Sequence, residues 1–310
     1  MDLSETNRRD QRQRGRTLNV SDVTLSIVIP NWNGQKLIRD LLGSIQAHPP
    51  PSPYEVIVVD NGSTDGSIAL IEHEFPEVHL IGNSSNLGYA RANNQGYAAS
   101  AGRFVLLLGN DTVILDRSVE KMVEYLDRHT DVGAVACRLL NTDGTLQGSC
   151  KRFPRLRDAA LTYLSLHWMA TRYNMRGFDY YQTQEVEQPA ATCLMIRREV
   201  IEQIGLFDER YTILYNDVDL CRRIWAAGWK IVFVGDAEII HHGSYSTLRS
   251  SPALRLEMYR NILLYHEDEA GLWARVILLP ILTVRLFGVL KSPVAFKLLL
   301  PQATNTAHDW

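Results

Sequence analysis

The stretch that decides the fold is YEVIVVDNGSTDGS, residues Tyr54 to Ser67. Its first half is a short apolar run rich in valine, and its second half is a polar loop of Asp, Asn, Gly, Ser and Thr. A continuous apolar run of this length is typical of a strand that is buried on both faces. The pattern therefore places a carboxylate, Asp60, at the end of a buried strand.

Strand and helix patterns alternate on both sides of this stretch. Expected strands cover TLSIVIP, YEVIVVD, VHLIG and RFVLLLG, and expected helices cover residues 36–47, 67–75 and 89–100. Helices between buried strands predict a parallel, Rossmann-like, doubly wound α/β sheet that runs to about Val135. Right-handed crossovers then bring the loops after the strands to one edge of the sheet, where ligands bind.

Those loops collect polar side chains at all four strand ends. They contain Pro30, Asn31 and Asn33, then Asp60, Asn61 and Ser63, then Asn86, Gly88 and Arg91, and finally Asn110 and Asp111. Because Asn, Asp, Gly and Ser are common in turns, the composition of any one of these loops needs no functional explanation. Four such loops at one edge of the sheet predict a crevice for a polar ligand. No G-x-G-x-x-G follows the first strand and no P-loop motif occurs, which argues against a dinucleotide cofactor.

The residue types in the crevice favour a nucleotide diphosphate clamped by a metal ion. Asp60 can accept hydrogen bonds from a base or a ribose. Asp111 can hold a divalent cation, because hard cations take oxygen ligands and commonly bridge a carboxylate to a diphosphate. Arg91 can pair with phosphate or with the loop of Asp60.

Composition describes an ordinary globular protein. The chain has 310 residues, 45% of them hydrophobic and 22% charged, with a net charge of −3. One large domain or two modest ones are expected, and no general attraction to nucleic acid. The four cysteines form no C-x-x-C pair, which argues against a zinc site and fits a reducing, cytoplasmic compartment.

Both ends of the chain differ from the α/β core. Residues 1–22 are rich in arginine and lack an apolar run, so they predict a disordered basic tail without a signal peptide. Residues 249–310 predict a helical extension, whose longest charge-free run, Val276 to Val284, is too short to span a bilayer. Two interpretations stay open for its apolar part: an interfacial anchor, which implies a peripheral location at the cytoplasmic face of the inner membrane, or a hydrophobic cap on the domain.

A second informative stretch is LYNDVDLCRRIWAAGW, Leu214 to Trp229. Asp217 and Asp219 stand in front of an apolar helical pattern. Carboxylates at this position cap a helix and complement its dipole, so the pair by itself does not distinguish a helix start from a catalytic group.

In order along the chain, seven motifs together resemble family 2 glycosyltransferases. They are LSIVIPNWNG, YEVIVVDNGSTDGS, NLGYARANNQG, FVLLLGNDT, CLMIRREVIEQIGLFDE, YNDVDLCRRIWAAGWKIVFV and EIIHHGSYST, between residues 24 and 247. The similarity is greatest to the rhamnosyltransferase-like branch that builds bacterial polysaccharides. It implies a GT-A fold at residues 23–248, with a nucleotide-binding half at 23–135, a mixed acceptor half at 136–248, and C-terminal helices.

The resemblance also implies roles for single residues. Pro30, Asn31 and Asp60 match positions that line the nucleoside pocket, with Asn33, Asn61, Ser63, Asn86, Gly88, Arg91 and Asn110 as further donor-binding positions. Asp111 matches the metal-binding carboxylate, and His241 matches a position that completes the metal shell, with His242 as the alternative ligand. Asp217 matches the catalytic base, and Asp219 a supporting helix-start residue. A structural role for His241 stays open.

Two positions depart from the family pattern. Asn216 stands where the family usually has a glutamate before the base, and Gly109 stands where an acidic or amide side chain is common. Both changes affect the detailed mechanism more than the fold. Residues 150–188, rich in Arg, aromatics and Leu, resemble the variable insertion before the acceptor region, and predict either a packed helical excursion or an acceptor platform.

Three functions are consistent with these patterns. The first is a metal-dependent, inverting hexosyltransferase that uses Mg²⁺ or Mn²⁺ to move a sugar, rhamnose by analogy, from a nucleotide-diphosphate donor to a lipid-linked or glycan acceptor. The second is a nucleotidyltransferase, although PNWNGQK lacks the Gly-rich basic loop of that class. The third is a non-catalytic sugar-nucleotide binder, which the changes at Asn216 and Gly109 motivate.

Overall fold

The computed structural model describes residues 23–166, 173, 175, 177–211, 214–243 and 252–290. The predicted tail at residues 1–22 and the segments 244–251 and 291–310 lie outside the described residues. The strands are β1 (Leu25–Asn31), β2 (Tyr54–Asp60), β3 (His79–Gly82), β4 (Phe104–Leu108), β5 (Thr112–Ile114), β6 (Val132–Leu140), β7 (Leu146–Gln147), β8 (Cys150–Lys151), β9 (Gln184–Glu185), β10 (Gln188–Pro189), β11 (Cys193–Arg197) and β12 (Lys230–His241). The helices are α2 (Gln35–Ala47), α3 (Ser67–Glu74), α4 (Tyr89–Ala98), α5 (Ser118–Arg128), α6 (Leu156–Tyr163), α7 (Arg198–Ile204), α8 (Asn216–Ala226), α9 (Pro252–Ala270) and α10 (Leu272–Leu290).

The N-terminal half forms the predicted parallel sheet. Its strand order is β3-β2-β1-β4, and β1 pairs with β2 and with β4 in parallel. The register of β1 and β2 ends with Asn31 opposite Asp60, so both polar side chains leave the sheet at the same edge. This confirms the doubly wound fold that the alternating pattern predicted.

The second half makes the sheet mixed, as the family resemblance implied. β11 runs antiparallel between β4 and β6, β12 pairs in parallel with β6, and β5 pairs antiparallel with the end of β12. The proposed division of the domain at Val135 falls inside β6, which continues to Leu140. The two halves therefore share one continuous sheet.

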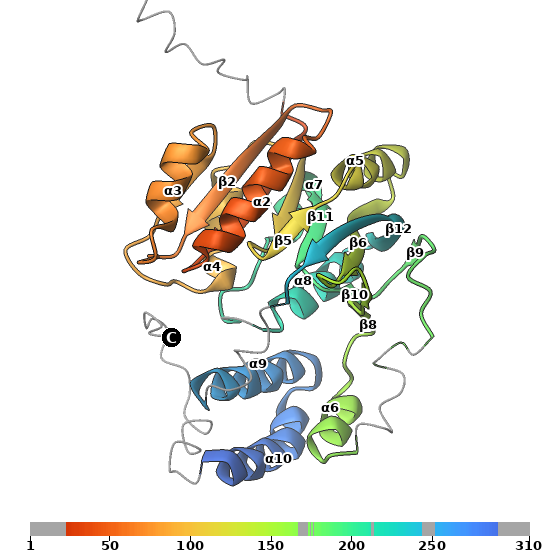
Figure 1. Cartoon of the computed structure of the whole chain (residues 1–310). Coiled ribbons are helices and arrows are strands. Elements are labelled where there is room, and N and C mark those ends of the chain that lie inside the picture. Colours follow the sequence, from red (N-terminus) through yellow and green to blue (C-terminus); the bar gives the residue numbers. More distant parts are fainter. Residues whose placement is uncertain are drawn as a thin grey trace, which may run out of the picture.

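Helices cover both faces of this sheet (Figure 1). Alternate residues of β1 point to opposite faces: Leu25, Ile27 and Ile29 pack with α2 and α3, whereas Val28 packs in the core that includes α4, α7 and α8. Because both faces are covered, the strands read as continuous apolar runs instead of alternating ones. The four cysteines, Cys137, Cys150, Cys193 and Cys221, are buried free thiols.

The C-terminal helices form a separate layer with α6 (Figure 1, lower part). Leu256 and Tyr259 of α9, Leu278 and Leu282 of α10, and Ala159 of α6 share one apolar core. The apolar segment thus packs on the protein by one of its faces, and the insertion at residues 150–188 contributes α6 to this layer. In the described part of the chain, none of the helices combines the length and the apolarity that crossing a bilayer requires.

Candidate functional site

Asn31 and Asp60 meet at the carboxyl ends of β1 and β2. Asn31 Nδ2 donates to Asp60 Oδ2 at 2.8 Å, and the backbone N–H of Ser63 donates to Asp60 Oδ1 at 2.7 Å. Both residues are buried, and each is nearly inaccessible to solvent. Pro30, also buried, directly precedes Asn31 in β1. A buried carboxylate fixed in this way is a rigid acceptor at the edge of the crevice.

The loop after β2 is fastened to the loop after β1. The Asn33 backbone N–H donates to Ser63 Oγ at 2.8 Å, and Asn33 Oδ1 accepts from the Thr64 N–H at 2.8 Å. Asn33 has a φ of +48°, a left-handed conformation that Asn tolerates better than most residues. The predicted donor-binding positions of the first two loops are therefore brought together as one hydrogen-bonded surface.

The third loop has two different attachments. Asn61 Nδ2 donates to the carbonyl of Gly88 at 3.3 Å, and the Gly88 N–H donates to Asn86 Oδ1 at 2.9 Å. Arg91, in contrast, forms an ion pair with Glu209 at 2.9 Å. The guanidinium of Arg91 is thus paired with a carboxylate of the acceptor half and not with the loop of Asp60.

The fourth loop, residues 109–111, joins the donor edge to the acceptor half. Asn110 Nδ2 donates to Asn31 Oδ1 at 2.8 Å, and the Gly109 N–H donates to the Thr192 carbonyl at 2.9 Å. A β-carbon at residue 109 would lie 2.9 Å from Asp111 Oδ1. A side chain in place of Gly109 would therefore require the Asp111 carboxylate to shift.

Asp111 and His241 come together although 130 positions separate them. His241 Nε2 lies 3.3 Å from Asp111 Oδ2, and His241 Nδ1 lies 2.5 Å from Gln147 Oε1. A proton on Nδ1, donated to Gln147, leaves the Nε2 lone pair facing the carboxylate. The side chain of the alternative ligand, His242, is exposed, and its backbone N–H donates to the Asp111 carbonyl at 2.8 Å.

This pair fits a divalent cation. A neutral imidazole nitrogen and a carboxylate oxygen at 3.3 Å repel each other unless a proton or a cation lies between them. Within the described ranges, no group of three or more His, Cys, Asp or Glu side chains is arranged to hold a metal. Asp111 and His241 are thus the two side chains here that could hold a cation.

Asp217 lies in the first turn of α8, next to Tyr215, which has a φ of +69°. Asp217 Oδ1 accepts from the Val218 N–H at 2.9 Å. Burial raises the pKa of Asp217 above its ordinary value, and the Val218 N–H and the positive charge of Lys151 partly oppose that rise. Asp217 is therefore a carboxylate whose proton affinity is increased, which suits a group that takes a proton.

Three neighbours of Asp217 are not among the site residues that the sequence analysis predicted. Gln188 Nε2 lies 3.5 Å from Asp217 Oδ2, and Lys151 acts on Asp217 through its charge. Burial raises the pKa of Tyr89, and the charges of Asp217 and Asp111 raise it further. The Tyr89 phenol donates to the Ala191 carbonyl at 3.2 Å. Because these contacts join distant segments, sequence spacing gave no signal for them.

The residues on either side of Asp217 have structural roles. Asn216 is buried, and its Oδ1 accepts from the Asp217 N–H at 2.9 Å. Asp219 is also buried and accepts from Arg223 Nε at 2.7 Å and from Arg222 Nη2 at 3.1 Å. Asp219 thus forms an ion-pair network inside α8.

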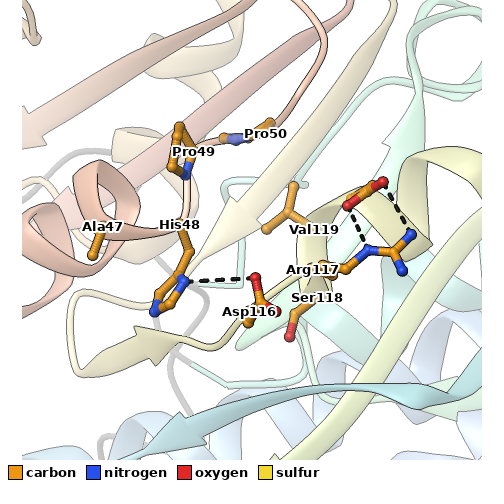
Figure 2. A pocket seen from close by; sticks show the side chains of 9 residues that line it. Ala47, His48, Pro49, Pro50, Asp116, Arg117, Ser118 and Val119 are labelled. Carbon is orange, nitrogen blue, oxygen red and sulfur yellow. Dashed lines mark hydrogen bonds and ion pairs between the residues drawn. The ribbon is translucent and has the colours of Figure 1, made fainter.

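A hollow at the far end of α2 is separate from this site (Figure 2). Its lining comes from residues 47–50 and 116–120, and His48 Nδ1 lies 3.8 Å from Asp116 Oδ1 there. The candidate site lies instead beyond the start of α2, where Asn31 and Asn33 leave β1.

A parallel sheet in the order β3-β2-β1-β4, with polar loops at its carboxyl edge, defines an α/β protein of the GT-A type. The chain belongs to glycosyl transferase family 2, whose family model matches residues 26–205. It is therefore a glycosyltransferase by family, as the motifs predicted.

Two relatives illustrate the family. The N-acetylglucosaminyl-diphospho-decaprenol L-rhamnosyltransferase of Mycobacterium tuberculosis is 28% identical over 239 residues, covering 72% of this chain and 78% of the relative. The O-antigen biosynthesis protein RfbC of Myxococcus xanthus is 29% identical over 235 residues, covering 72% of this chain and 17% of that protein.

Solved structures agree with the fold. The mannosyltransferase PcManGT of Pyrobaculum calidifontis, in complex with GDP-Man and Mn²⁺, has a TM-score of 0.54 at 19% identity and covers 96% of this chain and 85% of its own. GalNAc-T7 with UDP, GalNAc and Mn²⁺ has a TM-score of 0.56 at 17% identity and covers 77% of this chain and 47% of its own.

Proposed function

We propose that this protein is an inverting, metal-dependent glycosyltransferase. It transfers a sugar, rhamnose by analogy with the mycobacterial relative, from a nucleotide-diphosphate donor to a lipid-linked or polysaccharide acceptor in bacterial cell-surface glycan synthesis. The observation that carries the proposal is the position of Asp111 and Asp217, from different halves of the chain, within electrostatic reach of the same Tyr89 phenol.

The donor occupies the edge formed by the first three loops. Asn31, Asp60 and Ser63 form a fixed, largely buried set of amide, carboxylate and hydroxyl groups behind the nucleoside position. Asn33, Asn61, Asn86, Gly88 and Asn110 hold the loops in place. Arg91 contributes by fastening the third loop to Glu209 of the acceptor half. Donor binding therefore depends on a surface that is already ordered.

Asp111 and His241 would hold Mg²⁺ or Mn²⁺ between them, with His241 oriented by Gln147. When bound, the ion would offset the negative charge that grows on the departing diphosphate. PcManGT and GalNAc-T7, the structural neighbours described above, contain Mn²⁺. Asp111 would contribute its carboxylate and His241 its imidazole, and Gly109 keeps the space beside Asp111 open.

Asp217 is the general base. An acceptor hydroxyl is a poor nucleophile until a carboxylate removes its proton during attack, and such a base commonly contributes ~10²–10⁴-fold to the rate. The Asp217 Oδ1 contact with the Val218 N–H and the Gln188 amide near Oδ2 fix the orientation of the carboxylate. A single inverting displacement needs no covalent intermediate on the enzyme.

The acceptor side consists of α6, α8 and α9 with the segment around Lys151. The Lys151 ammonium, whose charge acts on Asp217, lies 5.3 Å from the centroid of the Tyr173 ring. The two side chains suit a phosphate and a sugar face respectively. The family membership removes the reason for the nucleotidyltransferase alternative. We place the protein at the cytoplasmic face of the membrane, in peripheral contact with it.

A screen of sugar nucleotides tests the proposal. Each donor is added to the protein with and without Mn²⁺, and the thermal midpoint is measured, because a ligand specific to the native state raises stability by mass action, ~2.7 kcal/mol at a hundredfold excess over Kd. The correct donor should stabilise the protein only with the metal, and NMR should show transfer with inverted anomeric configuration. Metal-dependent binding without any transfer would identify a non-catalytic binder instead.

A further inference from the structure

The turn between β6 and β7 contacts His241 across the sheet. β6 pairs with β7 on one side and with β12 on the other. The register sets Leu139 of β6 opposite Gln147 of β7. It also sets Leu140 opposite Ile240 of β12, which His241 directly follows. The Gln147 amide therefore meets the imidazole at the end of β6, with 2.5 Å between Gln147 Oε1 and His241 Nδ1.

Three polar side chains of the turn continue this contact as one line of hydrogen bonds. Gln147 Nε2 donates to Asn141 Oδ1 at 3.0 Å, and Asn141 Nδ2 donates to Thr145 Oγ1 at 2.9 Å. The Thr145 hydroxyl donates in turn to Asp143 Oδ1 at 2.6 Å. This line, from Asp143 through Thr145, Asn141 and Gln147 to His241, is the turn chain. Each of its two amides uses both its oxygen and its nitrogen.

The backbone fixes the turn that carries these side chains. The Asn141 N–H donates to the Thr145 carbonyl at 2.8 Å, and the Gly144 N–H donates to the Asn141 carbonyl at 2.9 Å. Gly144 has a φ of +80°, which glycine adopts without a steric cost. The Thr145 N–H donates to Asp143 Oδ1 at 3.0 Å. The spacing of the turn chain is therefore set by a tight hairpin.

The carboxylate at one end gives the turn chain a direction. Hydrogen bonds from Thr145 lower the pKa of Asp143, so this exposed carboxylate is ionised at neutral pH and only accepts. The Thr145 hydroxyl donates its one proton to Asp143, and its oxygen accepts from the Asn141 amide nitrogen. The Asn141 oxygen then faces Gln147 Nε2, and Gln147 presents its own oxygen to His241.

The opposite direction is less favourable. Turning the Gln147 amide alone would put its oxygen where its nitrogen now lies, 3.0 Å from Asn141 Oδ1, so that two acceptors would face each other. Turning both amides would require the proton of the Thr145 hydroxyl, which Asp143 would then lose. Because charge-assisted hydrogen bonds are roughly twice as strong as neutral ones, the carboxylate opposes this exchange.

The direction of the turn chain decides which nitrogen of His241 carries the proton. The Gln147 oxygen beside Nδ1 can only accept, so the proton of a neutral ring lies on Nδ1. Nε2 then keeps its lone pair, and it lies 3.3 Å from Asp111 Oδ2. An imidazole nitrogen binds a cation through that lone pair, and the hydrogen bond of the other nitrogen fixes the tautomer.

We propose that Asn141, Asp143 and Thr145 are positioning residues of the cation site, which act through Gln147 to keep the proton of His241 on Nδ1. The purpose of this arrangement rests on the proposed function, whereas the tautomer itself does not require a bound cation. The turn lies outside the seven motifs of the family resemblance.

Nitrogen NMR of the metal-free full chain tests the tautomer directly. Protein labelled with ¹⁵N in its histidines is studied at alkaline pH, where the nitrogen shifts themselves show when a ring is neutral. The chain has nine histidines, so the signals of His241 are identified as those missing from His241→Asn. Wild type should carry the His241 proton on Nδ1. A neutral His241 ring protonated on Nε2 in wild type would overturn the proposal.

Two substitutions at Asn141 separate its hydrogen bond from the fold of the turn. Asn141→Leu removes the acceptor that holds Gln147 Nε2, and the ratio of Nε2-protonated to Nδ1-protonated His241 should rise about tenfold. Asn141→Asp keeps an oxygen towards Gln147 and should retain the wild-type ratio. Thermal midpoints check that both variants are folded. A wild-type ratio in folded Asn141→Leu would contradict the proposal.

Asp143→Asn tests the direction of the turn chain at a position where no packing is lost, since Asp143 is exposed. An asparagine keeps the shape of the side chain but can also donate, so the share of Nε2-protonated His241 should rise about threefold. Thr142→Val is the matched control, because Thr142 is an exposed residue of the same turn outside the turn chain. Equal ratios in Asp143→Asn and Thr142→Val would show that the carboxylate does not set the direction.

Binding of Mn²⁺ alone, followed by EPR of the free ion, separates this inference from the proposed function. Loss of a partner behind a metal ligand commonly lowers metal affinity ~10–100-fold, so Asn141→Leu should bind Mn²⁺ more weakly than Asn141→Asp by about that factor. Equal Mn²⁺ affinities in the two variants would overturn the positioning role. Wild type with the proton on Nδ1 but without Mn²⁺ binding would instead contradict the metal dependence of the proposed function.

Discussion

At the scale of single residues, two aspartates of the same helix differ in their charge partners and in their proton affinity because their surroundings differ. Asp217 and Asp219 are two positions apart on α8, yet Asp219 is neutralised by Arg222 and Arg223, whereas burial raises the pKa of Asp217. The sequence pattern could not separate a cap from a base, because the separation comes from the ion pairs of Asp219 and from the burial of Asp217, and the spacing of the two aspartates encodes neither.

Asp219→Asn should destabilise the protein without removing the chemistry. The change leaves two arginines next to a buried neutral amide, and we expect a loss of about 2 to 3 kcal/mol in the free energy of unfolding. Urea denaturation measures this loss. The folded fraction should retain transfer activity within a few-fold of wild type, and a complete loss of transfer in well-folded protein would show that Asp219 takes part in the reaction.

Lys151→Gln should move the pH dependence of transfer. The Lys151 charge lowers the pKa of Asp217 against the larger effect of burial, so its removal should raise that pKa further. The base is active when ionised, and the acidic limb of kcat should therefore shift to higher pH. Lys151→Arg keeps the charge and should restore the wild-type profile. An acidic limb that stays in place in Lys151→Gln would rule out this electrostatic coupling.

At the scale of elements, the parallel half was predictable and the packing of the C-terminal helices was not. Strands β1, β2 and β4 read as continuous apolar runs because helices cover both their faces, and the polar loops mark where they end. β5 is a three-residue strand at the edge of the sheet, too short for a pattern. The contact of α9 with Leu214 and Tyr215 depends on tertiary packing that local spacing does not encode.

Buried His266 makes the attachment of α9 sensitive to acid. Burial lowers the pKa of His266 to about 4, and the Arg222 charge acts in the same direction, although Glu269 lies 3.3 Å away. Burial dominates because the His266 side chain is inaccessible, whereas Glu269 is partly exposed. The unfolded chain binds this proton more readily. The stabilising contribution is therefore complete above the ordinary pKa of histidine, about 6.5, and is lost as pH falls towards about 4.

We expect this single group to remove about 3 kcal/mol of stability over that pH interval. Thermal denaturation of wild type and of His266→Gln at a series of pH values measures the effect. His266→Gln should show a shallower dependence on pH, whatever its stability at neutral pH. His73→Gln, at a position in the last turn of α3, should keep the wild-type slope. If stability depended on pH equally in wild type and in His266→Gln, His266 would not be the group responsible for the loss of stability in acid.

At the scale of the whole molecule, two halves of one sheet contribute to the proposed site. The proposed donor half supplies Asn31, Asp60 and Asp111, and the proposed acceptor half supplies His241 and Asp217. Two hydrogen bonds connect the two sets: the Tyr89 phenol donates to the Ala191 carbonyl, and the Gly109 N–H donates to the Thr192 carbonyl. The family motifs predicted most of these residues one by one. That Asp111 lies next to His241, and that Gln147 contacts the His241 ring, became visible only in the folded structure.

The most direct test of this account compares Asp217→Asn with Asp111→Ala. Both binding of the donor with Mn²⁺ and single-turnover transfer are measured for each variant. Asp217→Asn should bind donor as wild type does while transfer falls by ~10²–10⁴-fold, because only the base is lost. Asp111→Ala should lose the dependence of donor affinity on Mn²⁺. Transfer by Asp217→Asn at a rate close to wild type would contradict the central claim that Asp217 removes the acceptor proton.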